Sequence, residues 1–342
     1  MLKIVLSLVL AVFVVFCFCY LAPAVGVQPA TPPEYGGVIN FWHVETFEGG
    51  SQNRQKWLNG VVRQFEKSHT GVYVCVSTYT HQQAVEKLES GETFDVVSFS
   101  VGTGNALLPY LCPLEVSTGD ILDNFVDAGK VDNTLYALCY STGFYALFAR
   151  QKHLDSLGQV SLQSATQKGN LQVKIGKNLV TLDSMGYGVG NFNNPSLALD
   201  GATTRHNLTQ YQAYEQFVGG KSFVVLLGTQ RDAYRLSNRL DQGKIENLAF
   251  EVLPTYTDLA QYLALSTAAG EKATPCRQLV EYLTSTQVQM QLANLYLLSP
   301  TSLSVYGEGW MNQAQQMLPT ISTPSVFVDV EKRGKKVVGY AN

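Results

Sequence analysis

The chain has 342 residues and a formal net charge of −3, and 46% of its residues are hydrophobic while only 15% are charged. This composition excludes an intrinsically disordered chain. The near-neutral charge and the absence of long Lys/Arg runs argue against nucleic-acid binding as the main task. A chain of this length usually forms about two domains.

The N-terminal segment is typical of export or membrane anchoring. After Lys3, residues 4–22 run for 19 residues without a charge. This exceeds the ~7–15 residues of a signal-peptide core and approaches the ~20 that span a bilayer. Residues 22–24 (Ala-Pro-Ala) have the small-x-small pattern of a cleavage site, so a cleaved signal and an uncleaved anchor are equal alternatives; a buried terminal helix is a weaker third. Either of the first two places the protein body after the spacer 28–37 outside the cytoplasm.

The cysteine pattern predicts neither lipidation nor a metal site. In the leader, Cys17 and Cys19 each follow phenylalanine, whereas a lipidated cysteine would follow a small residue. The other four form no C-x-x-C pair and no histidine lies at ligand spacing, so we expect no zinc and no cofactor. Export would permit a disulfide, with Cys112–Cys139 as the first pair to test, but buried free thiols are at least as good an interpretation. The four are Cys75, Cys112, Cys139 and Cys276.

Strands and helices are predicted to alternate in the first third of the chain. The expected order is strand 37–42, helix 57–70, strand 72–77, helix 84–90, strand 95–99 and helix 106–111. This alternation implies a parallel sheet with helices on its faces. Because ligands bind beyond the carboxyl ends of such strands, the loops 43–50 and 100–105 are candidate ligand-binding loops.

The remaining two thirds give a less regular pattern. Residues 135–148 are apolar and aromatic, and the glycines at 186, 188 and 190 indicate a loop. Further elements are expected at 210–218 (helix), 221–227 (strand), 232–240 (helix), 249–253 (strand), 275–284 (helix) and 287–298 (helix).

The sequence contains no complete catalytic or nucleotide-binding motif among those compared with it. Residues 219–222 (Gly-Gly-Lys-Ser) resemble part of a phosphate-binding loop, but Glu215 occupies the position of its first glycine and a helix precedes it. No H-E-x-x-H or G-x-S-x-G sequence occurs, and the five histidines are not paired at useful intervals. Because no nucleophile–base constellation can be named, the pattern favours binding without chemistry.

Tryptophans near the predicted loops are candidate ligand contacts, because an aromatic face can stack on a sugar ring. Trp57 falls on the apolar face of a predicted helix, which favours a core position. Trp42 ends the first predicted strand and Trp310 lies in a polar stretch. For both, structural packing is an equally good interpretation.

Nine short segments stand in a characteristic order between residues 37 and 310. They are residues 38–43, 65–67, 71–74, 94–97, 135–140, 217–228, 252–254, 279–287 and 299–301. In order and spacing they resemble family 1 extracellular solute-binding proteins, the sugar-type receptors of ABC importers. In that family, residues 135–140 would form the first crossing between lobes, and proline usually stands where this chain has Cys139.

The resemblance implies an α/β, two-lobed periplasmic-binding-protein-like fold of type II, with a hinge between the lobes. After the leader (1–36), the N-terminal lobe would comprise 37–139 plus 260–300, and the C-terminal lobe 140–259 plus 301–342. Such a receptor is a monomer that closes over one small solute and then docks on an ABC permease in the membrane.

Carried over position by position, the resemblance implies a ligand cleft formed by residues after the first and third strands, at the hinge and in the second lobe. They are Trp42, His43, Glu45, Phe99, Ser100, Tyr140, Tyr187, Gln230, Arg231 and Trp310. Where the family often has an aromatic residue after the glycine aligned with Gly228, this chain has Thr229, Gln230 and Arg231. A guanidinium there could meet an anionic ligand group, although a surface arginine is the more ordinary role.

Three functions therefore stay open. The first is an importer receptor, for which the resemblance favours a carbohydrate ligand. The second is a membrane-anchored ligand sensor without transport. The third, a secreted enzyme on a similar scaffold, is disfavoured by the missing catalytic constellation.

Overall fold

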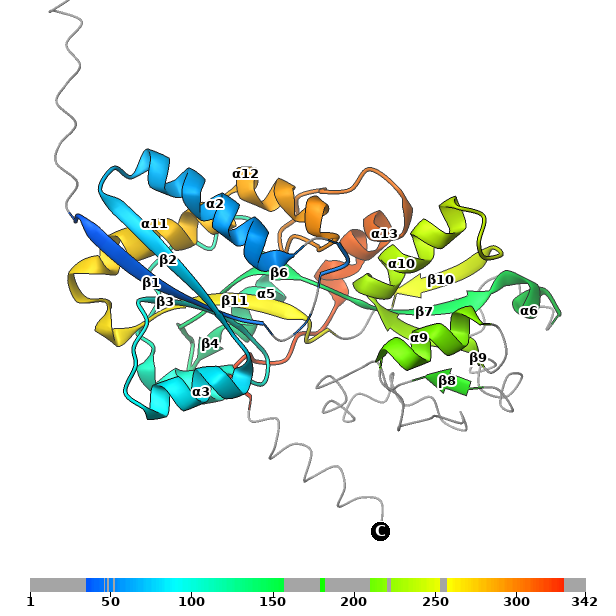
Figure 1. The fold of residues 1–342 in the computed structure, drawn as a ribbon, viewed down its shortest axis with the longest axis horizontal. Coiled ribbons are helices and arrows are strands. Elements are labelled where there is room, and N and C mark those ends of the chain that lie inside the picture. The colour runs from blue at the N-terminus through cyan, green and yellow to red at the C-terminus, as the bar shows by residue number, and fades with distance from the viewer. Residues whose placement is uncertain are drawn as a thin grey trace, which may run out of the picture.

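Two β-sheets lie side by side along the molecule, each covered by helices (Figure 1). The structure is a computed structural model that describes residues 35–45, 47, 49–51, 53–156, 179–181, 210–219, 223–252 and 257–328. We call the half built on the five-stranded sheet the large lobe and the half built on the four-stranded sheet the small lobe. This is the α/β, two-lobed architecture that the sequence predicts, although the leader and Tyr187 lie outside the described residues.

The large-lobe sheet has the strand order β2-β1-β3-β11-β6. Its strands are β1 (Gly37–Val44), β2 (Val72–Tyr79), β3 (Val96–Ser100), β6 (Leu138–Thr142) and β11 (Ala260–Leu265). The first three are parallel, as expected, but β11 runs antiparallel to both β3 and β6. The sheet is mixed, because β11 returns from the small lobe and enters it in the opposite direction.

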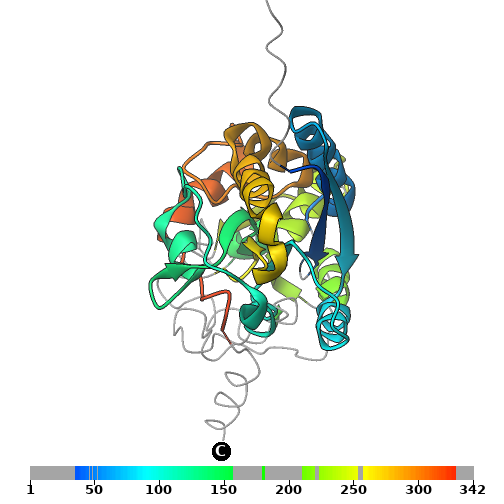
Figure 2. The same ribbon diagram turned by 90° about the vertical axis from the view of Figure 1, so that its left-hand side faces the viewer.

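Apolar faces and side-chain caps account for the helices of the large lobe. Asn53 caps α2 by accepting from the backbone N–H of Lys56, and Thr80 forms a capping box with Gln83 at the start of α3. The helices are α2 (Arg54–Ser68), α3 (His81–Glu89), α4 (Gly104–Leu107), α5 (Asp123–Ala128), α11 (Ala273–Thr284) and α12 (Thr286–Gln289). Figure 2 views this lobe end-on, with β1 and β2 at one edge and α11 toward the viewer.

Shorter elements complete the large lobe. They are the 3₁₀ helices η2 (Leu108–Tyr110), η4 (Thr267–Lys272) and η5 (Met290–Leu295), and the hairpin of β4 (Lys130–Val131) and β5 (Thr134–Leu135). The helix expected over 287–298 is thus divided between α12 and η5. It stops at Tyr296, whose left-handed φ of 54° ends the helical path.

The small-lobe sheet has the order β10-β7-β9-β8. Its strands are β7 (Tyr145–Arg150), β8 (Leu179–Thr181), β9 (Phe223–Thr229) and β10 (Leu248–Val252). Strand β7 pairs antiparallel with both β9 and β10, and β8 is parallel to β9. Its helices are α6 (Gln151–Ser156), α9 (Gln210–Val218) and α10 (Gln230–Asp241).

The chain first crosses between the lobes at Gly143, where β6 leads into β7 (Figure 1). The return segment lies beside this crossing. The N–H of Gly143 donates to the Leu259 carbonyl at 2.6 Å, and the Tyr145 hydroxyl donates to Asp258 Oδ1 at 2.8 Å. The sheet therefore changes at Gly143, three residues beyond the predicted boundary at residue 140, because residues up to Thr142 still pair with β11.

The C-terminal described segment bridges both lobes and then returns to the large one. It contains α13 (Gly309–Met317) and η6 (Leu318–Thr320). Trp310 stacks on Phe250 of β10, whereas Gln315 donates to the Ser299 carbonyl in the large lobe. The ring of Phe327 then packs against Phe99, so residues 318–328 do not follow the predicted assignment to the second lobe. Among the described residues, no helix is both long and apolar enough to cross a bilayer.

Candidate ligand-binding site

An open cavity of about 400 Å³ lies where the two lobes face each other. The large lobe contributes the loop after β1 and the start of α2, and the small lobe contributes the first turns of α10. Its described lining residues are Glu45, Gly49, Gly50, Ser51, Asn53, Arg54, Arg231, Tyr234 and Arg235. The predicted ligand loop after the first strand therefore does reach the cavity.

The glycines of this loop allow a close backbone approach to the end of η5. A Cβ atom on Gly50 would lie 2.5 Å from the Cβ atom of Tyr296, closer than side chains tolerate. The next residue, Ser51, donates its N–H to the Leu295 carbonyl at 3.1 Å and its hydroxyl to the Asn294 carbonyl at 2.6 Å. These hydrogen bonds hold the loop 49–51 against the large lobe in the absence of a ligand.

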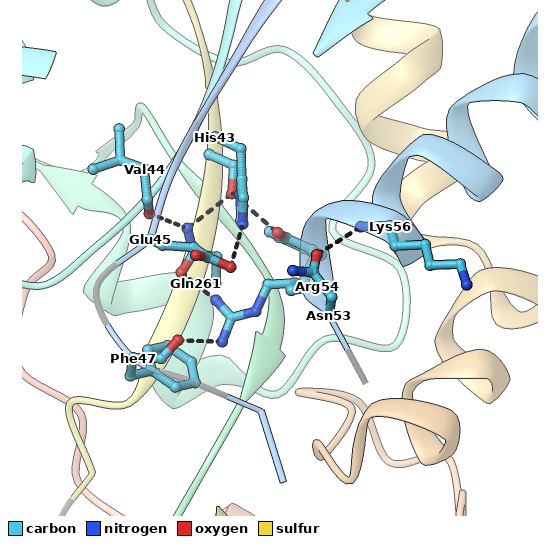
Figure 3. A network of polar contacts seen from close by, with 10 residues as sticks. His43, Val44, Glu45, Phe47, Asn53, Arg54, Lys56 and Gln261 are labelled. Atoms are coloured by element: carbon cyan, nitrogen blue, oxygen red, sulfur yellow. Dashed lines mark hydrogen bonds and ion pairs between the residues drawn. The ribbon is translucent and has the colours of Figure 1, made fainter. Parts of the chain in front are cut away.

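A buried arginine fixes the same loop from behind (Figure 3). Arg54 is only 3% exposed, and its guanidinium donates to Gln261 Oε1 at 3.0 Å and to the Phe47 carbonyl at 2.6 Å. Gln261 in turn donates to the Val44 carbonyl at 3.0 Å and to Ser98 Oγ at 2.9 Å. These bonds join β1, β3, β11 and α2 into one buried polar network beneath the cavity.

His43 belongs to this network and stands directly behind Glu45. Its Nδ1 lies 3.1 Å from Ser98 Oγ, and its Nε2 lies 3.8 Å from Glu45 Oε1. Complete burial lowers the pKa of His43 and favours the neutral ring at pH 7. The tautomer with hydrogen on Nε2 is favoured, because that hydrogen faces the Glu45 carboxylate while Nδ1 accepts from the serine hydroxyl.

Glu45 carries its negative charge into the cavity. Its side chain is 44% exposed, and the nearby imidazole of His43 is the main cause that lowers its pKa, with the charge of Arg54 adding to the effect. The carboxylate is therefore ionised at neutral pH and can accept hydrogen bonds from ligand hydroxyl groups.

The small-lobe wall consists of one helix face. Thr229 and Asp232 form a capping box at the start of α10, which fixes the first turn. Arg231 and Arg235 lie one helical turn apart, so they share a face toward the cavity. Between them, the ring of Tyr234 meets the ring of Tyr296 from the large lobe at a centroid distance of 5.1 Å.

The structure brings some of the predicted site residues together at this cavity. Glu45 and Arg231 line it, and His43 supports Glu45 from behind. Tyr140 is buried behind this network, with its hydroxyl 3.0 Å from Ser98 Oγ. Burial raises the pKa of Tyr140 to about 12, so its hydroxyl stays protonated at neutral pH. Gln230, the first residue of α10, is buried against Gly143 at the crossing between lobes.

Other predicted residues pack away from the cavity. Trp42 is 4% exposed in the large-lobe core, with its ring 5.2 Å from that of Phe94. Phe99 is buried beneath the C-terminal segment, and Ser100 donates to the Asp258 carbonyl at 3.4 Å. Trp310 packs on the small-lobe sheet. A ligand role for these four residues stays a prediction, as it does for Tyr187, which lies outside the described residues.

Sequence reasoning missed several residues that line the cavity, chiefly Arg54, Tyr234 and Arg235. The two arginines carried a signal in the sequence. Asn53 is a good helix N-cap and marks Arg54 as the first helical residue, at the mouth of a ligand-side loop. The four-residue spacing of Arg231 and Arg235 in a predicted helix places both on one face.

The four cysteines beyond the leader are free thiols in the structure. The suggested Cys112–Cys139 bridge is absent: Cys139 is buried in β6 and Cys112 lies beside the Leu265 and Ser266 carbonyls. Within the described part of the chain, no group of three or more His, Cys, Asp or Glu side chains is arranged to hold a metal.

Solved structures of sugar-binding proteins share this architecture. The sugar-binding protein MalE of Xanthomonas citri superposes with a TM-score of 0.65 at 16% identity, covering 88% of this chain and 91% of its own. A sugar transporter protein of Rhizobium etli, in an open conformation, gives 0.62 at 9% identity over 90% and 93% of the two chains. The fold is that of ABC-transporter sugar-binding proteins.

A third neighbour is the galacto-N-biose/lacto-N-biose I-binding protein of the ABC transporter from Bifidobacterium longum, in complex with lacto-N-biose. It has a TM-score of 0.61 at 12% identity and covers 89% of this chain and 92% of its own. At such identities the likeness shows a common fold. No protein-family model and no curated protein sequence matches the chain.

Proposed function

We propose that this chain is the extracytoplasmic solute-binding receptor of an ABC importer, and that it carries one carbohydrate in the cavity between its lobes to a membrane permease. The observation that carries the proposal is a cavity lined from both lobes, in a fold shared with sugar-binding proteins of such transporters. The uncharged segment 4–22 supports a position outside the cytoplasm.

The chemistry of the lining suits a polyhydroxylated ligand. Glu45 and Asn53 offer acceptor oxygens, and the Asn53 amide nitrogen offers donors from the large lobe. Tyr234 presents an aromatic ring and Arg231 a forked donor from the small lobe. A ligand that contacts both walls binds the closed conformation most tightly. It therefore shifts the equilibrium between open and closed conformations of the protein toward the closed one.

The test is a binding screen on the full-length chain by thermal shift and calorimetry, with maltose, lacto-N-biose, glucose, galactose, glucuronate, galacturonate, sugar phosphates and single amino acids. We expect at least one saccharide to raise the unfolding temperature and to be recovered chemically unchanged. Stabilisation by amino acids alone, or conversion of the sugar, would contradict the proposal.

A matched pair of variants locates the binding. Glu45→Gln should weaken saccharide binding by about tenfold, because a charged acceptor is replaced by a neutral amide. Glu89→Gln, at the exposed end of α3, serves as the control and should bind as the unmodified chain does. Equal affinity in all three proteins would place the ligand elsewhere.

A further inference from the structure

We infer that His43 is a positioning residue that fixes Glu45 for ligand recognition, as the last donor in a one-way chain of hydrogen-bond donors. The chain starts at a buried arginine of the large lobe and ends at the carboxylate in the cavity. Its members are, in order, Arg54, Gln261, Ser98, His43 and Glu45. This role rests on the proposed function and deepens it, because it determines which ligand groups the large-lobe wall accepts.

The direction of the chain is set at its buried end (Figure 3). The guanidinium group of Arg54 can only donate, so Gln261 Oε1, which lies 3.0 Å from Nη1, must accept. The amide nitrogen of Gln261 then points the other way and donates to the Val44 carbonyl at 3.0 Å and to Ser98 Oγ at 2.9 Å. A reversed amide would place its NH₂ group against the guanidinium group, donor against donor. Ser98 is therefore an acceptor toward Gln261.

Ser98 passes this direction on to His43. Its hydroxyl group has one hydrogen and two lone pairs, and the Gln261 N–H occupies one lone pair. The Tyr140 hydroxyl lies 3.0 Å from Ser98 Oγ and makes no other hydrogen bond to a described residue, so it donates to the second lone pair. The hydrogen of Ser98 is then left for Nδ1 of His43, at 3.1 Å. With hydrogen on Nδ1 instead, one of these buried hydrogens would have no acceptor.

The imidazole of His43 therefore carries its hydrogen on Nε2, on the side of the cavity. The ring is 0% exposed, and the acceptor that Nε2 faces is Glu45 Oε1 at 3.8 Å, a contact longer than a hydrogen bond. Among the described residues, Nε2 has no hydrogen-bond partner. A buried N–H without a close acceptor is unfavourable, so it attracts the carboxylate and limits the positions that Glu45 can take.

The charges at the two ends of the chain support this arrangement. The imidazole of His43 is the main cause that lowers the pKa of Glu45, and the charge of Arg54 adds to it. Glu45 in turn opposes the lowering of the Arg54 pKa by burial. The other titratable group in the network, the Tyr140 hydroxyl, stays protonated because burial raises its pKa to about 12. A neutral His43 thus connects a cation to an anion without a charge of its own.

The chain leaves Glu45 as an acceptor for the ligand. Its side chain is 44% exposed and lines the cavity, so lone pairs of the carboxylate remain open on that side. A ligand hydroxyl or amine that meets Glu45 donates its hydrogen, whereas an ether oxygen or a carboxylate finds no donor on it. Recognition at this wall therefore depends on Glu45 and on the ring that holds it.

Two substitutions of His43 separate the roles of its two nitrogens. His43→Gln places an amide nitrogen near the position of Nε2 and keeps a donor toward Glu45, whereas His43→Asn keeps an acceptor for Ser98 and loses that donor. Calorimetry on the full-length chain measures affinities for maltose, lacto-N-biose, glucose, galactose, glucuronate and galacturonate. For each sugar that binds, His43→Gln should stay within about threefold of the unmodified chain and His43→Asn should bind about tenfold more weakly. His69→Gln, at the opposite end of α2, is the control and should not change the affinity.

The tautomer of His43 is a readout that a merely structural role would not change. Nuclear magnetic resonance of the full-length chain with ¹⁵N-labelled histidine reports it, and His43→Gln identifies the signals. At pH 7.5 without sugar we expect hydrogen on Nε2 of His43 and none on Nδ1. Gln261→Glu still accepts from Arg54 but has no hydrogen for Ser98, so the Ser98 hydroxyl should turn toward it and hydrogen should appear on Nδ1.

The outcomes distinguish the donor chain from the proposed function. Hydrogen on Nδ1 in the unmodified chain would overturn the inference, and so would His43→Gln and His43→Asn variants that bind a sugar equally well. Unchanged ring nitrogens in a folded Gln261→Glu variant would also overturn it, because Gln261 would then not set the direction. A panel in which no saccharide binds would refute the proposed function, while the ring nitrogens would still test the chain of donors.

Discussion

The two walls of the cavity are built in different ways. On the large-lobe wall, the loop 49–51 is bonded to the end of η5, and the start of α2 is held by the buried network of Arg54 and Gln261. The small-lobe wall is one face of α10, whose side chains at 231, 234 and 235 are only partly buried. The first wall is fixed by interior hydrogen bonds, and the second is carried by a helix that starts at the crossing between lobes.

This difference indicates a division of roles. A rigid wall presents its acceptors in one geometry, so it can recognise a ligand before closure. A helix attached beside Gly143 can approach or withdraw as the lobes rotate, because Gln230 at its start packs on that crossing glycine. Damage to the large-lobe wall should therefore cost folding stability, while changes on α10 should mainly alter binding.

The largest effect is expected from Gln261→Leu. The substitution removes the acceptor of Arg54 and both hydrogen bonds that the amide nitrogen donates, and it leaves buried polar groups unpaired. We expect a loss of about 3 kcal/mol in the free energy of unfolding, measured by urea denaturation. Gln316→Leu, at an exposed position of α13, is the control and should stay within about 0.5 kcal/mol of the unmodified chain. Equal stability of the two variants would show that the network does not fix the wall.

A smaller effect should appear as a pH dependence carried by His43. Because burial lowers its pKa below 6.5, the native state binds fewer protons than the unfolded state below that pH. Stability should therefore fall as the pH drops below about 6.5, with a slope of at most about 1.4 kcal/mol per pH unit for this group. Glu45 stays ionised over this range, since its own pKa is lowered.

The measurement is thermal and urea unfolding at pH 7.5 and 5.5, compared between the unmodified chain and His43→Gln. The variant should lose part of the acid-induced destabilisation. If both proteins respond equally to acid, His43 is not the group that titrates.

The smallest effect is expected on the small-lobe wall, from Tyr234→Ala. The ring contact with Tyr296 crosses between the lobes, and such pairs contribute about 0.5–1.5 kcal/mol. Ligand affinity should fall up to about tenfold with little change in unfolding by urea. Tyr73→Ala, at a position 61% exposed on β2, should change neither quantity. Loss of stability as large as that of Gln261→Leu would contradict the distinction between the walls.

The sequence predicts local elements well and non-local ones poorly. Apolar periodicity locates β1 to β3 and α2 because those signals lie within one segment. The antiparallel entry of β11 depends on pairing with β3, more than 150 residues earlier, and no local pattern encodes that direction. The helix expected over 287–298 is interrupted because Tyr296 must turn toward Gly50, a contact between distant segments.

The site follows the same rule. Glu45 is predictable because it stands in the loop after the first strand, where α/β folds place ligands. The family resemblance alone points to Arg231, which lies in the first turn of α10. The place of Arg54 at a helix start is predictable from Asn53, but its burial is not, since an arginine there is ordinarily exposed. Only the packing of β11 against β3 provides Gln261 as its buried acceptor. In the sequence, Trp42 and Trp310 are candidates for sugar stacking. In the fold, Trp42 is buried against Phe94, whereas Trp310 is half-buried and stacks on Phe250.

The most direct measurement is hydrogen exchange of the full-length chain with and without the tightest-binding saccharide of the panel, followed by mass spectrometry of peptides and of the recovered sugar. The proposal of a ligand clasped between two walls predicts joint protection of peptides covering residues 45–54 and 230–235, with the sugar returned intact. Protection confined to one lobe, for example at the separate cavity beside Ser117 and Glu281, or a chemically altered sugar, would contradict it.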